Sequence, residues 1–162
     1  MSRMNRLPFL ALTAGLLAGA CAGSTKYIYG TKVVDTKENR SLLGVVEQYR
    51  LALERKDTQT LLNLASKEYW EDGGTPTGSD DYGYDGLREV LDSRFARADG
   101  IRYSVRYMDV KRMNNNRAAV DVLIDASYSI ETANGKQRKD MRDQNEMVLM
   151  WDGANWKFVS GM

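Results

Sequence analysis

The first part of the chain shows apolar residues at helical spacing, separated by turn-rich segments. One stripe recurs at three- and four-residue steps, the spacing of a buried helix face, at Leu42, Leu43, Val46, Tyr49 and Leu53. Ser41 is placed to cap this helix, and Asp57 to cap a second one with apolar residues Leu61, Leu62, Leu64 and Ala65. After the turn-rich stretch 71–86, a third helix is predicted from Asp85, with apolar residues Leu87, Val90, Leu91 and Phe95.

After Gly100 the apolar positions change to a period of two, which predicts antiparallel strands. One strand carries Ile101, Tyr103, Val105 and Tyr107, and the next carries Val120, Val122, Ile124, Ala126, Tyr128 and Ile130. Asn134-Gly135 is a strong hairpin signal, and further strands are predicted at about 137–151 and 155–160. Three helices followed by a four-stranded meander predict an α+β fold with the helices on one sheet face.

The N-terminus predicts an export signal rather than part of the fold. Arg3 and Arg6 precede the uncharged 14-residue run Leu7–Ala20. A helix needs about 20 apolar residues to cross a bilayer, so this run is too short to be a stable membrane span. It ends in Ala18-Gly19-Ala20, directly before Cys21, the only cysteine.

This arrangement resembles the lipobox of bacterial lipoproteins, in which the signal peptide is removed before a cysteine that then carries acyl chains such as palmitate. The resemblance implies a signal peptide over residues 1–20, a lipidated Cys21 on a membrane, and a tether over residues 21–40. Ala18 stands where the lipobox usually has Leu, so an ordinary secretory signal that leaves Cys21 as a free thiol is the alternative. Ala22 after the cysteine favours the outer membrane over the inner one, by resemblance to the sorting rule of enteric bacteria.

Composition narrows the chemistry. The chain has no histidine, which excludes imidazole acid–base catalysis and His-ligated metals, and one cysteine excludes an internal disulfide or a multi-cysteine metal site. Lys and Arg number 23 against 22 Asp and Glu, which argues against a non-specific nucleic-acid binder. We therefore expect no metal, no cofactor and no nucleic-acid partner.

The order of the predicted elements resembles the NTF2-like (SnoaL-like) superfamily of cone-shaped α+β domains. The resemblance rests on a long first helix with an inward Tyr, a D-x-x-x-L-L-x-L second helix and an acidic, Gly-rich connection. The ending WDGANWKF is similar to the usual final hairpin, W-x-D-G-x-W-K-I. The resemblance implies one domain over residues 41–162, with three N-terminal helices on a curved antiparallel sheet of about four strands around a conical pocket. The superfamily contains both enzymes and non-catalytic domains, so fold alone does not select a function.

Similarity to ketosteroid isomerase implies candidate catalytic residues. Tyr49 would be the oxyanion donor and Asp72 the base. Asp121 or Asp125 would be a second acid on the sheet. Tyr49 also suits a core, Asp72 precedes the turn-forming Gly73-Gly74, and both sheet carboxylates fall on the polar side of an alternating strand. We therefore expect a non-catalytic domain, with an isomerase- or cyclase-like enzyme using Tyr49 and Asp72 as the alternative.

Aromatic residues suggest a ligand pocket. The predicted pocket residues are Tyr49, Tyr69, Trp70, Asp72, Tyr103, Tyr107, Tyr128 and Trp151. Rings lining a cone would stack on a small apolar ligand, although the same rings suit a core or an interface. The segment 81–86 (DYGYDG) begins like a calcium loop, but Gly83 and Asp92 stand where that loop needs an oxygen ligand and a Glu, so no metal site is expected.

Charge is distributed unevenly. Residues 68–92 carry eight acids and one base, whereas residues 93–142 carry eleven bases and six acids. The sheet face with Arg102, Arg106 and Arg142 is the expected homodimer surface. The sequence thus predicts a lipid-anchored envelope protein whose domain binds a small apolar ligand or an envelope protein, with a structural subunit of an envelope complex as a further alternative.

Overall fold

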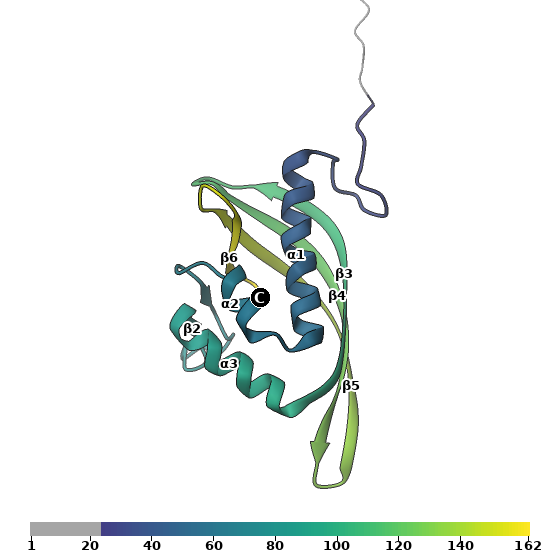
Figure 1. Cartoon of the computed structure of the whole chain (residues 1–162), viewed down its shortest axis with the longest axis vertical. Coiled ribbons are helices and arrows are strands. Elements are labelled where there is room, and N and C mark those ends of the chain that lie inside the picture. Colours follow the sequence, from purple (N-terminus) through teal and green to yellow (C-terminus); the bar gives the residue numbers. More distant parts are fainter. Residues whose placement is uncertain (1–23) are drawn as a thin grey trace, which may run out of the picture.

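A computed structural model describes residues 24–162 of the chain (Figure 1). Its helices are α1 (Lys37–Arg55), α2 (Thr58–Leu64) and α3 (Tyr84–Arg97). Its long strands are β3 (Ala98–Arg112), β4 (Arg117–Thr132), β5 (Gly135–Trp151) and the shorter β6 (Trp156–Ser160). Two brief strands, β1 (Trp70–Glu71) and β2 (Tyr82–Gly83), lie between α2 and α3 in the chain. The predicted signal peptide and Cys21 lie outside the described residues.

The main sheet has the strand order β3-β4-β5-β6, and all its neighbours are antiparallel. The α+β class, the four-stranded meander and a hairpin at this place are therefore confirmed. The two turn residues are Ala133 and Asn134, since Thr132 pairs with Gly135 across them. The helices lie on one side of the sheet, and the β4–β5 hairpin extends past them (Figure 1). We call the side away from the helices the outer side.

The core lies between the helices and the sheet. Successive residues of a strand point to opposite faces, so the buried Val120, Val122 and Ile124 of β4 all face the helices. Leu42 and Val46 of α1 pack into the same cluster. The period-two pattern in the sequence thus reports which sheet face is covered, and the residues between these three belong to the outer side.

The folded part begins earlier than predicted. Thr36, rather than Ser41, caps α1, because its Oγ1 accepts a hydrogen bond from the backbone N–H of Asn39 at 3.0 Å. Tyr27 and Val34 form an isolated antiparallel bridge, and Val33 is buried in the core cluster. The end of the segment expected as a tether is therefore packed against the domain.

The predicted starts of the second and third helices agree with the structure to different degrees. Asp57 caps α2 as predicted, with Oδ1 accepting from the N–H of Thr60 at 2.9 Å. The third helix, predicted from Asp85, begins one residue earlier at Tyr84, and Asp85 lies within its first turn rather than capping it. Gly83 precedes α3, and its backbone is already held in an extended conformation because Gly83 pairs with Trp70 in the small β1–β2 sheet. Within residues 24–162, every helix is too short or too polar to traverse a lipid bilayer.

Candidate functional site

Aromatic rings fill the space between α1 and the sheet. Tyr49, in the middle of α1, meets Tyr103 edge to face with ring centroids 5.9 Å apart, and Phe158 of β6 at 5.3 Å. Only 3% of Tyr49 is exposed. Burial, and then the neighbouring Tyr103, raise the pKa of the Tyr49 hydroxyl well above its ordinary value. Tyr49 is therefore a neutral core residue at every physiological pH.

Two further predicted pocket residues are anchored by their hydroxyl groups. Tyr107 donates to the carbonyl of Leu43 at 3.4 Å, and burial raises its pKa to about 12. Tyr69 donates to Glu71 Oε2 at 2.6 Å, and burial followed by this contact raises the pKa of Tyr69. The same carboxylate oxygen accepts the N–H of Gly161 at 2.8 Å. Tyr69 and Glu71 thus fasten the C-terminus to the body of the domain.

The other predicted pocket residues lie elsewhere. Asp72 is exposed, and its Oδ1 accepts from the N–H of Gly74 at 2.8 Å, which makes it a turn former. Trp70 is 56% exposed, and Trp151 at the end of β5 packs against Trp156. Tyr128 is half-buried on β4.

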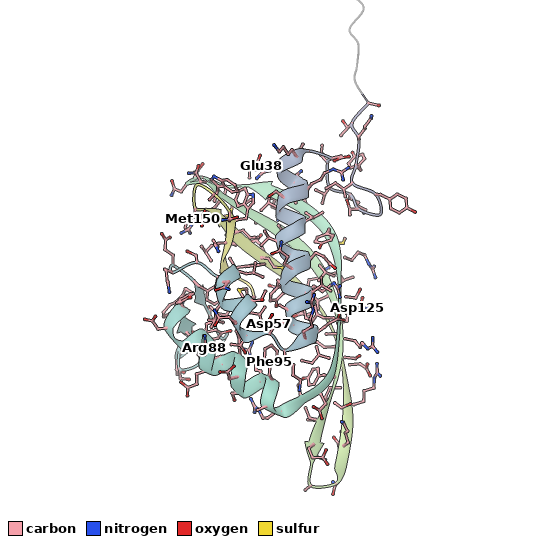
Figure 2. All side chains as sticks on the ribbon, viewed as in Figure 1. Glu38, Asp57, Arg88, Phe95, Asp125 and Met150 are labelled. Carbon is pink, nitrogen blue, oxygen red and sulfur yellow. The ribbon has the colours of Figure 1, made fainter. Side chains whose placement is uncertain are left out.

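The candidate sheet acids occupy the outer side. Asp121 pairs with Lys111 Nζ at 2.7 Å, and Asp125 pairs with Arg142 Nε at 2.5 Å. Figure 2 shows Asp125 on the sheet, away from Asp57 on the helical side. Tyr49 faces the core from α1, so the isomerase-like grouping of a tyrosine with two carboxylates is not assembled by these residues.

An open groove of about 830 Å³ runs from α1 across β3 and β4 to β5. Its middle lies at one register level, where Tyr103, Ala126 and Met141 are neighbours on three adjacent strands. The charged residues that line it are Glu47, Arg50, Glu54, Arg102, Asp125, Arg138, Asp140 and Arg142. Of the predicted pocket residues, Tyr103 is the one that lines this groove.

Two side chains of α1 cap the open edge of β3 beside this groove. Arg50 Nη1 donates to the carbonyl of Tyr103 at 3.2 Å, and the N–H of Tyr103 donates to Glu54 Oε1 at 2.9 Å. Arg50 also pairs with Glu54 at 2.9 Å. The N–H of Tyr103 lowers the pKa of Glu54, and Arg50 lowers it further. These bonds fix the helical wall of the groove against the sheet.

The sheet wall of the groove carries charges of both signs. Arg138 pairs with Asp140 at 3.0 Å and donates to Ser127 Oγ at 2.9 Å. Arg102 has no ion-pair partner among residues 24–162. The same part of the chain contains no cluster of acidic or cysteine side chains that could hold a metal ion. A balanced set of fixed charges is suited to a polar partner surface rather than to an apolar ligand.

No protein-family model and no curated protein matches this sequence. Solved structures do match it. A ketosteroid isomerase-like protein from Erwinia carotovora atroseptica is 18% identical, with a TM-score of 0.63 over 78% of this chain and 95% of that one. A protein from Novosphingobium aromaticivorans, assigned as a scytalone dehydratase, is 14% identical, with a TM-score of 0.66 over 76% of this chain and 80% of that one.

The chain has the NTF2-like fold. A further structural match is a calcium/calmodulin-dependent protein kinase II association domain assigned in Xanthomonas campestris, which is 10% identical. It has a TM-score of 0.59 over 78% of this chain and 86% of that one. Identities this low establish the fold alone.

In this NTF2-like domain the structure gathers some predicted residues and separates others. Tyr49 and Tyr103 meet in the core, while Trp70, Asp72, Asp121 and Trp151 do not join them. Sequence reasoning missed Glu71, because a strand of two residues has no alternation from which its facing can be predicted. It also missed the groove, whose walls come from segments far apart in the chain.

Proposed function

We propose that this protein is a lipid-anchored bacterial envelope protein whose NTF2-like domain is a non-catalytic interaction module. The observation that carries this proposal is the contrast between a filled interior and an open, charged groove. Tyr49, the residue that an isomerase-like site would need at a substrate, is enclosed by Tyr103 and Phe158. The groove, by contrast, is accessible along α1, β3, β4 and β5.

The chemistry of the groove favours a protein partner. Four acidic and four basic side chains line it, so it attracts neither a polyanion nor a purely cationic ligand as a whole. Arg102, which lines the groove, is exposed, charged and without an ion-pair partner in residues 24–162.

 Arg102 is therefore free to pair with an acidic group on another protein. A similar fold is named as an association domain in Xanthomonas campestris, which supports the same interpretation.

The anchor rests on the sequence. Cys21 follows a charged start and a short apolar run that ends in small residues, and two or three acyl chains hold a protein firmly on a bilayer. The segment before α1 leaves the domain at one end of the molecule (Figure 1), which supports attachment through that end. We place the anchor in the outer membrane, because Ala22 follows the cysteine.

The anchor is tested by fractionation of host cells that produce the full chain. Cys21→Ala is expected to move the protein out of the membrane fraction, whereas the control Ser24→Ala is expected to leave it there. A Cys21→Ala protein that still sediments with membranes would show that acylation is not what holds the protein.

The groove is tested by site-specific photo-crosslinking in the same cells. A benzophenone amino acid in place of Arg102 is expected to give a discrete adduct with another protein, and one in place of Arg97, on the exposed face of α3, is not. Ser104→Arg fills the groove beside position 102 and is expected to abolish the adduct. Equal labelling at positions 102 and 97, or an adduct that survives Ser104→Arg, would overturn the groove as the binding surface.

A further inference from the structure

One edge of β5 is unpaired over most of its length. β5 pairs with β4 from Gly135 to Met150, but it pairs with β6 only from Val148 to Trp151. Within residues 24–162, no other strand pairs with the remaining edge. The free edge ends near Glu146, because a Cβ on Gly161 would lie 2.4 Å from the Glu146 carbonyl oxygen. Part of this edge belongs to the hairpin that extends past the helices (Figure 1).

The backbone groups on this edge can be assigned from the turn. Thr132 and Gly135 flank a two-residue turn, so they form a hydrogen-bonded pair within the hairpin. Bonding alternates along an antiparallel strand, so every second residue from Lys136 directs its N–H and C=O away from β4. The outward-directed residues on the free edge are Lys136, Arg138, Asp140, Arg142 and Gln144.

The side chains on this edge are self-complementary about Met141. When a second copy of the segment 137–145 (QRKDMRDQN) lies antiparallel with Met141 opposite itself, Lys139 faces Asp143 and Asp140 faces Arg142. Arg138 then faces Gln144, and no like charges are opposed. Each ion pair occurs twice because of the two-fold symmetry. Lys139 and Asp143 are exposed and make no ion pair within residues 24–162.

Neighbouring registers lack this match. With Asp140 on the axis, Asp140 would face its own copy and Arg138 would face Arg142. With Arg142 on the axis, two Arg142 side chains would be opposed, and like charges directly opposite each other destabilise a sheet. The Met141 register also brings Asp140 opposite Arg142, both of which direct their backbone groups outward, so that the ladder bonds can form.

We propose that two copies of this chain pair edge to edge through β5, with Met141 on the two-fold axis, and join their four-stranded sheets into one. Charged side chains normally prevent an edge strand from pairing with other strands. On β5, the order of the charged side chains disfavours pairing with an arbitrary strand but matches a second copy of the same strand. Met141, which is 45% exposed in the single chain, is covered by its copy in the pair.

This interface differs from the sheet-face dimer expected from Arg102, Arg106 and Arg142. It deepens the proposed interaction role by naming one partner, and it does not depend on the lipid anchor or on the α1 side of the groove.

Disulfide trapping tests the register. The test uses Met141→Cys in the full chain, which also carries Cys21→Ala. In the proposed dimer, residue 141 and its copy form a non-hydrogen-bonded pair with their Cα atoms about 4.5 Å apart, a distance that a disulfide can bridge. Mild oxidation is therefore expected to give a covalent dimer. Lys139→Cys is the matched control on the same strand, because its copies would be about 13 Å apart along the pair. Equal dimer formation by both variants, or by neither, would overturn the register.

Charge exchange tests the pairing without cysteines. Lys139→Asp and Asp143→Lys are each expected to raise the dimer dissociation constant about tenfold in sedimentation equilibrium, because two attractive pairs become repulsive. The double variant Lys139→Asp/Asp143→Lys is expected to restore dimerisation. A double variant no better than the singles would refute the edge pairing. Dimerisation of this kind without an adduct at position 102 would support the edge interface and refute the groove as a binding surface. An adduct at position 102 without dimerisation would support the groove and refute the edge interface.

Discussion

Removing the hydroxyl of Tyr69 tests whether this residue is structural or belongs to a ligand pocket. The hydroxyl donates to Glu71 Oε2 at 2.6 Å, and the N–H of Met162 donates to the same hydroxyl at 3.3 Å. A hydrogen bond to a charged group contributes about 2 kcal/mol to stability. We therefore expect Tyr69→Phe to lower the free energy of unfolding by about 2 kcal/mol, which corresponds to a fall of about 6 °C in Tm.

The assay is urea unfolding followed by tryptophan fluorescence, with Tyr82→Phe as the control. Tyr82 lies beside Tyr69, with ring centroids 6.3 Å apart, and its hydroxyl forms no hydrogen bond within residues 24–162. The control is expected to change stability by less than about 0.5 kcal/mol. If Tyr69→Phe is as stable as Tyr82→Phe, the link from Tyr69 to the C-terminus does not contribute, and the reasoning is refuted.

Three further predictions concern α1. Tyr49→Ala is expected to cost about 3–5 kcal/mol in chemical unfolding, because it empties a fully packed site; a change below about 1 kcal/mol would contradict the filled interior. Thr36→Ala is expected to cost about 1 kcal/mol in the same assay through loss of the helix cap, and an unchanged midpoint would contradict that role. The lowered pKa of Glu54 means that its contribution is present above the unfolded-state pKa and is lost as pH falls through the folded-state pKa. The stability difference between wild type and Glu54→Gln should therefore shrink from neutral pH to about pH 3, and a constant difference would exclude this contribution.

The sheet could be predicted because its signals are local. Alternation at Val120, Val122 and Ile124 indicates one covered face, and the Asn134-Gly135 signal marks the position of the hairpin between β4 and β5 to within one residue. Both signals are complete within a few residues, so distant parts of the chain are not needed to interpret them.

The facing of Tyr69 and Trp70 could not be predicted in the same way. The two are adjacent, and both were expected in one pocket, yet Tyr69 is buried whereas Trp70 is exposed. Which of the two points inward is set by the pairing of Trp70 with Gly83 and by the arrival of Gly161 at Glu71, contacts between segments far apart in the sequence.

The groove could not be predicted from the sequence for a related reason. The sequence indicates that Arg50 and Glu54 lie on the solvent-facing side of an amphipathic helix, but it does not indicate which residues lie beside them in the fold. The rotation of α1 brings them onto the open edge of β3 at Tyr103, where they become a wall. Charge on one element can be predicted from sequence, but the neighbour that it meets cannot.

The segment before α1 and the tip of the β4–β5 hairpin lie at opposite ends of the long axis of the molecule (Figure 1). In an antiparallel pair through β5, the two-fold axis reverses the direction of one copy relative to the other, so the two N-terminal segments would lie at opposite ends of the assembly. Two lipid anchors could then reach a single bilayer only if the assembly lay flat along it. Edge pairing and acylation together thus imply a protein that either lies parallel to one membrane or spans the gap between two facing ones, and that does not stand upright on a single surface.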